Sequence, residues 1–275
     1  MPNLRIIHDN AADRATVTAS STAGTLAAEN MLTDIKGDFH RSGDTSVIYT
    51  LSWSDFETVA GIALPACNLT PDATIRVRGY DAATGGALVA DSGEKFACPG
   101  PPLGLWDWAM PLNSNAFAYG GAAKTAAWFD DHYAVKRIEI ELNDPDNAAG
   151  YIDCARIVAG AYWSPAYNPL YGATTGLEDN SKNSRNDAGD LITDRGAIND
   201  AMRFDLAYMP PADRARMNQI MRGSGTARPV FISLMPDSTD ALLEQDSMIY
   251  GKRQNAPMAF ANYKTYSTNI TIEGW

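Results

Sequence analysis

The chain has 275 residues, of which 45% are hydrophobic and 20% are charged. This composition excludes a wholly disordered protein and supplies enough apolar residues for one large domain or two ordinary ones. The formal net charge is −11, whereas a general nucleic-acid binder carries a basic field. We therefore expect no nucleic-acid partner.

Three further features bear on the compartment. No apolar stretch approaches the roughly 20 residues that a membrane-spanning helix needs, so no membrane insertion is expected. Residues 1–9 contain neither a long apolar core nor a small-residue cleavage site, which argues against Sec-type export. The three cysteines, Cys67, Cys98 and Cys154, are odd in number and widely spaced. They predict buried free thiols, not a disulfide framework or a zinc site.

Strand patterns dominate the first half of the chain. The expected strands are 45–53, 59–64, 74–78, 136–142 and 152–159. In the first of them Val47, Tyr49 and Leu51 share one face, because side chains alternate along a strand. In the strand at 136–142, Ile138, Ile140 and Leu142 are expected to point inward for the same reason. Residues 82–86 form a glycine-containing turn that indicates a hairpin. Only residues 26–32 are typical of a helix in this half, and that helix is short.

A probable domain boundary follows. Residues 161–169 hold two prolines and no alternation, which is typical of an extended connector. Residues 178–190 are polar and turn-rich, and they indicate either a long loop or a strand pair with weak packing. Strands are then expected at 202–208, 229–234 and 266–272, with one helix over 211–222 that begins at a proline.

No residue pattern indicates catalysis or metal binding. His8, His40 and His132 are not in metal-ligand spacing. Residues 223–225 are Gly-Ser-Gly. A nucleophile elbow, G-x-S-x-G, has one further residue between the serine and each glycine, so this segment does not match it. The acidic and amide run at 178–190 lacks the residue order of a calcium loop. We therefore expect no enzyme activity, no cofactor and no metal.

A long insertion rich in Gly, Pro and Ala occupies residues 99–129. Its aromatic residues are Trp106, Trp108, Phe117, Tyr119, Trp128 and Phe129. They indicate a satellite core under a long loop, which is favoured, a protein interface, or a glycan site. The ligand-binding candidates are Trp106, Trp108 and Trp128. The subunit-contact candidates are Tyr119, Phe129, Tyr162, Trp163, Tyr167 and Tyr171.

Residues 15–158 resemble the galactose-binding-like (discoidin-type) jelly-roll modules found in phage tail proteins. The matching segments are 18–21, 28–32, 39–42, 59–69 and 73–78, of which GIALPACNLT followed by ATIRVR is the most specific. The second half resembles the ring-forming domains of tail-tip proteins, on its strand, helix, strand order and on residues 270–275. The order of the two domains is the reverse of that in typical distal tail proteins.

The predicted fold is all-β, with an N-terminal jelly-roll β-sandwich over 1–161 and a C-terminal β-sandwich or barrel with one helix over 162–275. The resemblance implies a non-enzymatic structural protein of a long-tailed phage tail tip or baseplate, made and assembled in the bacterial host cytoplasm. Its partners would be its own copies, in a ring, hexamer or trimer, and other tail proteins. The contact segments would be 106–128, 162–171 and 178–190. The alternatives are a module that binds a host-surface glycan and a glycan-processing enzyme.

Overall fold

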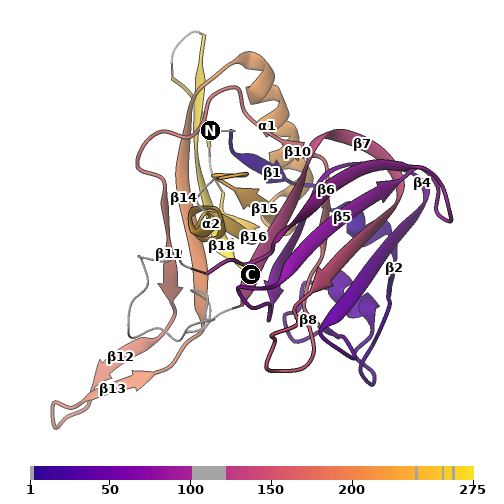
Figure 1. Cartoon of the computed structure of the whole chain (residues 1–275). Coiled ribbons are helices and arrows are strands. Elements are labelled where there is room, and N and C mark those ends of the chain that lie inside the picture. The colour runs from indigo at the N-terminus through magenta and orange to yellow at the C-terminus, as the bar shows by residue number, and fades with distance from the viewer. Residues whose placement is uncertain (1–2, 101–121, 239–240, 256, 262–263) are drawn as a thin grey trace. The chain divides into compact units, whose positions relative to one another are not determined.

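The computed structural model describes residues 3–100, 122–238, 241–255, 257–261 and 264–275 (Figure 1). The chain forms two compact units. Unit 1 comprises Met1–Ser164 and Phe231–Met248, and unit 2 comprises Pro165–Val230 and Ile249–Trp275. The sequence predicts two domains that are each one continuous stretch of chain. In the structure neither unit is continuous, because residues 231–248 belong to unit 1 and interrupt unit 2. The boundary between domains at 161 and 162 stays a prediction.

Unit 1 is built from antiparallel strands. They are β1 (Arg5–Ile7), β2 (Thr16–Ala19), β3 (His40–Arg41), β4 (Ser46–Cys67), β5 (Thr74–Tyr80), β6 (Leu88–Phe96), β7 (Ala123–Asn143), β8 (Asp153–Cys154), β9 (Val158–Gly160), β10 (Tyr162–Trp163) and, apart from its first residue, β15 (Val230–Ser233). Short 3-10 helices lie at Ala11–Arg14 and Ala28–Leu32, and α2 spans Ala241–Asp246. The chain as a whole is mainly β, as the sequence predicts; the short α2 was not expected.

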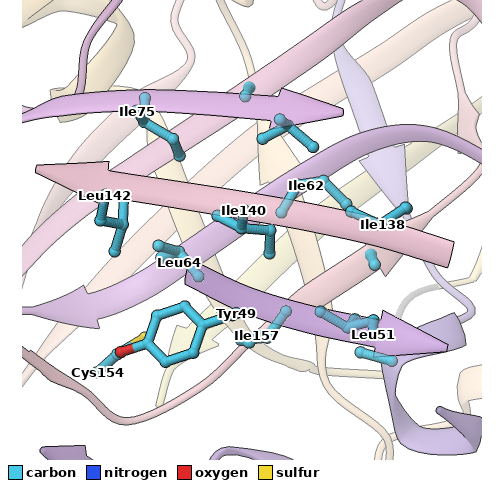
Figure 2. Packing of buried hydrophobic residues seen from close by; sticks show 14 of the residues in the cluster. Tyr49, Leu51, Ile62, Leu64, Ile75, Ile138, Ile140, Leu142, Cys154 and Ile157 are labelled. Atoms are coloured by element: carbon cyan, nitrogen blue, oxygen red, sulfur yellow. The ribbon is translucent and has the colours of Figure 1, made fainter. Parts of the chain in front are cut away.

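Two long strands organise the β-sandwich of unit 1. The first part of β4 pairs with the last part of β7, and the second part of β4 pairs with the start of β7 and with β9. Register shifts interrupt the β4–β7 ladder at three places, and such bulges let a strand bend and serve two layers. The inward side chains of both layers, among them Tyr49 and Ile62, join one buried cluster (Figure 2).

The alternation seen in the sequence determines which side chains enter this core. Tyr49, Leu51, Ile138, Ile140 and Leu142 are fully buried, as predicted. Each such side chain stabilises the fold by about 1.5–3 kcal/mol relative to an exposed one. Burial of these side chains therefore stabilises unit 1.

The sequence prediction is wrong about two strand limits. It separates 45–53 from 59–64, whereas β4 is one continuous strand across both. It extends the insertion to Phe129, whereas β7 already begins at Ala123 and buries Trp128 and Phe129. The bulges explain the first error, because the residues around them break the alternation without ending the strand.

Buried polar groups close one end of the sandwich. The Arg156 side chain is 3% exposed and pairs with Asp13 at 2.8 Å and with Asp34 at 3.2 Å. Its Nη1 also donates to the Met31 carbonyl oxygen. These bonds hold both 3-10 helices, since one helix contains Asp13 and the other contains Met31.

The three cysteines are buried free thiols, which confirms that prediction. Burial raises the pKa of Cys154 well above its ordinary value. The pKa of Cys98 is also raised, first by its hydrogen bond with Cys67 and then by burial. Because the thiolate is the reactive form, Cys98 and Cys154 are not suited to nucleophilic chemistry.

Unit 2 contains one sheet, one helix and a projecting hairpin. Its elements are β11 (Thr174–Asp179), β12 (Lys182–Arg185), β13 (Leu191–Asp194), β14 (Ile198–Met209), α1 (Pro211–Ser224), β16 (Met248–Arg253, from its second residue), β17 (Met258–Phe260) and β18 (Tyr266–Gly274). The sheet order is β16-β18-β14-β11, and β17 also pairs with β18. The hairpin is the two-stranded sheet β12-β13.

Helix α1 confirms the prediction for 211–222. It begins at Pro211, where the missing N–H costs nothing, and Gly225 at φ 56° follows its end. Its buried residues Met217 and Ile220 face the core, and the helix contacts β14, which buries Phe204 and Leu206. None of the helices in the described part of the chain has both the length and the apolar character needed to cross a bilayer.

Candidate interaction surface

The most exposed structure of unit 2 is a long hairpin, residues 174–198, which we call the arm (Figure 1). Its strand β11 pairs with the first half of β14, which continues beyond the arm, and its strand β12 pairs with β13. The paired register runs from Thr174 opposite Arg203 to Arg185 opposite Leu191. At ~3.3 Å per residue, this ladder is about 40 Å long.

A one-residue shift joins the inner and outer parts of the arm. Asp179 lies opposite Ile198, whereas Lys182 lies opposite Asp194, so the returning strand contains one extra residue. Gly196 lies at this point, and a Cβ there would come within 2.3 Å of the Asn180 backbone. Glycine is therefore required where the two strands approach each other.

The tip of the arm is closed by local hydrogen bonds. The Asn186 N–H donates to the Asp190 carbonyl oxygen at 3.1 Å, and the Asp190 N–H donates to Asn186 Oδ1 at 2.8 Å. Gly189 adopts φ 89°, which favours glycine. Of the two structures that the sequence left open for 178–190, a loop or a strand pair, the structure has the strand pair.

No layer covers the arm in the described part of the chain. Every residue of β11, β12 and β13 is exposed. Four large aliphatic side chains are among the exposed ones, namely Leu177 (72%), Leu191 (60%), Ile192 (52%) and Ile198 (59%). Leu191 and Ile192 are adjacent in one strand, so they point to opposite faces, and both faces of the hairpin are apolar in part.

The connector that precedes the arm shows the same exposure. The Ala166 N–H donates to Asp213 of α1, and the Leu170 N–H donates to the Asp205 carbonyl oxygen of β14. These bonds fix the backbone, yet the side chains of Tyr167 and Tyr171 remain in solvent. An ordered backbone that presents aromatic side chains outward is typical of a contact surface.

The arm also carries charges of both signs. Lys182 and Arg185 lie on β12, and Asp190 and Asp194 lie at the start and end of the returning strand. The Ser181 side chain and N–H bond to Asp179 and lower the pKa of that carboxyl group. The surface thus combines aliphatic side chains with acidic and basic ones.

The ligand-binding candidates do not form an exposed aromatic platform in the described residues. Trp106 and Trp108 lie outside the described residues. Trp128 is 7% exposed, its Nε1 donates to Glu244 at 3.2 Å, and the Arg5 guanidinium lies 4.8 Å from its ring centre. Its ring also covers Gly61, its partner in the ladder. Intramolecular contacts therefore occupy Trp128, and ligand binding by these residues stays a prediction.

The subunit-contact candidates separate into three groups. Tyr119 lies outside the described residues. Phe129 and Trp163 are buried in unit 1, and Tyr162 packs edge-on against Trp128. Tyr167 and Tyr171 are exposed.

The aliphatic residues of the arm were missed, although the sequence holds a signal for them. Leu191 and Ile192 form an isolated apolar pair within a long polar run, with no periodic partners that a core would require.

The described residues show no grouping of three or more side chains suited to a metal ion. The carboxyl group of Glu244 is buried, and burial raises its pKa above the ordinary value. Its Oε1 accepts hydrogen bonds from Trp128 and from the Asp237 N–H, so this carboxyl group supports the fold of unit 1.

Comparison with known proteins gives only distant similarity. No protein-family model matches the chain, and no curated protein matches it. Among solved structures, it is similar to a Ruminococcus gnavus GH29 fucosidase in complex with fucose, with 13% identity, a TM-score of 0.39 and coverage of 57% of this chain. The match spans 27% of the fucosidase chain.

Two other similar structures are single modules. The chitosan-binding module 1 from a Paenibacillus chitosanase/glucanase has 12% identity and a TM-score of 0.37, and the match covers 56% of this chain and 100% of the module. The family 32 CBM from Clostridium perfringens NanJ in complex with galactose has 13% identity and a TM-score of 0.37. The match covers 58% of this chain and 99% of that module. Such low scores transfer neither a fold family nor a ligand to this chain.

Proposed function

We propose that this protein is a non-enzymatic structural protein that associates with other polypeptides through unit 2. The arm is the observation that carries the proposal, because every residue of β11, β12 and β13 is exposed although these strands are paired along the arm, with one interruption at residues 180–181. A two-stranded hairpin that packs against nothing is at best marginally stable in water. A partner that covers it supplies the missing layer.

Within this class we propose a role in the tail tip or baseplate of a long-tailed phage. The support is the sequence resemblance of residues 15–158 together with two compatible properties. The net charge of −11 disfavours adhesion to DNA. Buried free thiols suit a chain that folds and assembles in a reducing cytoplasm.

The association surface can be tested by removing it. Replacing residues 181–196 by Asn-Gly joins Asn180 to Ala197 through a two-residue turn, since these residues already pair. In an extract of the native source, the unaltered chain is expected to elute in a particle far larger than its own 29.6 kDa. The shortened chain, expressed in its place, is expected to elute near the mass of one chain. Elution of the unaltered chain as a monomer would contradict the proposal.

Glycan binding is the second candidate, and one cluster of unit 1 favours it. The Arg41 guanidinium lies 3.8 Å from the ring centre of Tyr151 and donates to both carboxylate oxygens of Asp153, at 2.8 and 2.9 Å. All three residues are partly exposed. An aromatic ring beside paired donors and acceptors suits the apolar face and the hydroxyl groups of a sugar.

A glycan array with Tyr151→Ala, Arg41→Ala and Trp106→Ala separates the two candidates. Arg76→Ala is the matched control, because Arg76 forms the same two-bonded pair with Asp91 on β5 and β6. Sugar binding that is lost in the first three variants and kept in the control would support a glycan-binding module. Absence of binding to any glycan would leave the structural role.

A further inference from the structure

The two strands at the end of the arm carry opposite charges. Strand β12 contains Lys182 and Arg185 and no acidic residue. Strand β13 ends at Asp194 and contains no basic residue; Asp190 directly precedes it and Arg195 directly follows it, so this edge keeps a net negative charge. The hairpin therefore has a basic edge and an acidic edge.

Both edges are open in the described part of the chain. Strands β12 and β13 form a sheet of two, so each has a neighbour on one side only. The outward backbone N–H and C=O groups of each strand are available to a further strand. Open edges of this kind are the usual route by which one chain extends the sheet of another.

Direction and charge match when the occupant is a second copy of the chain. Strand β12 runs toward the tip, and β13 runs back from it. Rotation about an axis along the arm places β13 of one copy beside β12 of the next, with the strands antiparallel and the acidic edge against the basic edge. Pairing of two like edges would instead bring Lys182 and Arg185 of both copies together, which is unfavourable.

We propose that the arms of successive copies pair through β13 of one copy and β12 of the next. This inference rests on the proposed function and names the partner as the chain itself. Because the two edges differ, the contact is heterologous. Successive contacts close into a ring when the rotation from one copy to the next is a whole-number fraction of a full turn. Each Leu191 and Ile192 then has a neighbouring strand on both sides.

Charge reversal of one edge at a time tests the pairing. K182E/R185E gives a hairpin with two acidic edges, and D190K/D194K gives one with two basic edges. Sedimentation velocity of the purified full-length chains, over a concentration series, measures self-association. Each variant alone is expected to associate more than about tenfold more weakly than the unaltered chain, because like charges meet at the contact.

An equal mixture of the two variants provides the decisive measurement. Acidic and basic hairpins can alternate, so the mixture is expected to regain the association that each variant lacks. Recovery also shows that both variants are folded. D72K/E94K is the control for D190K/D194K, because it makes the same change of charge at exposed positions of unit 1, and it is expected to associate like the unaltered chain.

Three results would overturn the inference: an unaltered chain that stays monomeric throughout the series, single-edge variants that associate normally, or a mixture that regains nothing. A monomeric purified chain that still elutes in a large native particle would remove self-pairing alone and leave the proposed function intact. A chain that is monomeric both when purified and in the native extract would contradict both the self-pairing and the proposed function.

Discussion

The two units differ in how far their large apolar side chains are buried. Unit 2 is about half as long as unit 1, yet it holds nine of the fourteen large apolar side chains that are exposed in the described residues. In unit 1, Tyr49 and Ile140 lie side by side on the paired strands β4 and β7 and are fully buried. In unit 2, Leu191 and Ile192 face solvent on opposite sides of a hairpin. Unit 1 buries its core within one chain, whereas we propose that a second polypeptide covers the arm of unit 2.

The largest contrast is expected from matched truncations in the two units. Ile140→Ala removes a fully buried side chain from β7 and is expected to lower the free energy of unfolding by about 3–4 kcal/mol. Ile192→Ala removes a side chain of the same type that is 52% exposed, and its cost is expected to stay within about 0.5 kcal/mol. Denaturant unfolding of the dilute chain measures both. Equal losses would mean that the arm is packed within the monomer.

Arg156→Ala gives the next largest effect. The change leaves the Met31 carbonyl oxygen and the carboxylates of Asp13 and Asp34 without this donor. Because both carboxylates are partly exposed, the expected loss is about 2–3 kcal/mol. Arg76→Ala breaks a more exposed pair and is expected to cost about 1 kcal/mol or less. Similar melting temperatures for the two variants would argue against a structural role of Arg156.

A smaller effect is expected at the contact between Gly61 and Trp128. A Cβ at residue 61 would lie 2.3 Å from the indole ring, so Gly61→Ala forces the ring or the strand to move. The expected cost is about 1–2 kcal/mol, with a change in tryptophan fluorescence. Gly43→Ala is the control, because a Cβ there would lie in ordinary contact, 3.7 Å from Ser21. Unchanged fluorescence and stability in Gly61→Ala would contradict the packing described here.

The smallest effect concerns pH. Burial raises the pKa of Glu244 above 4.5, so the folded chain binds this proton more tightly than the unfolded chain. The free energy of unfolding therefore falls as pH rises from 4.5 through the raised value, and the loss is complete above it. Glu244→Gln keeps an oxygen that accepts from Trp128 and is expected to be more stable than the unaltered chain at pH 7 but not at pH 4.

Thermal unfolding across this pH range provides the measurement for Glu244. Glu94→Gln, at an exposed position of β6, serves as the control for loss of a carboxylate. A difference between Glu244→Gln and the unaltered chain that does not depend on pH would show that the effect is one of packing and not of the buried charge.

Local pattern predicts much of the fold. Alternation identified the buried faces of Val47–Leu51 and Ile138–Leu142, and a proline followed by an apolar stripe identified α1. The continuous β4 and the burial of Trp128 over Gly61 could not be predicted, because both depend on pairing with residues far along the chain.

The candidate surface was predicted in part. Tyr167 and Tyr171 were predicted as contact residues because they belong to the connector, whose first part is extended and holds two prolines. The apolar residues of the arm were not predicted as contact residues. Leu191 and Ile192 are adjacent, so they match neither the spacing of an amphipathic helix nor the alternation of a strand with one buried face. A surface that a partner completes leaves no periodic signal in the sequence of one chain.

Amide hydrogen exchange of the arm tests the central claim most directly. Exchange at residues 174–198 is followed in dilute protein and in concentrated protein or native particles. The account predicts that these amides exchange rapidly in the dilute chain and become protected on association, while β4 and β7 stay protected in both. Arm amides that are protected to the same extent at every concentration, or that remain unprotected in the assembled state, would contradict it.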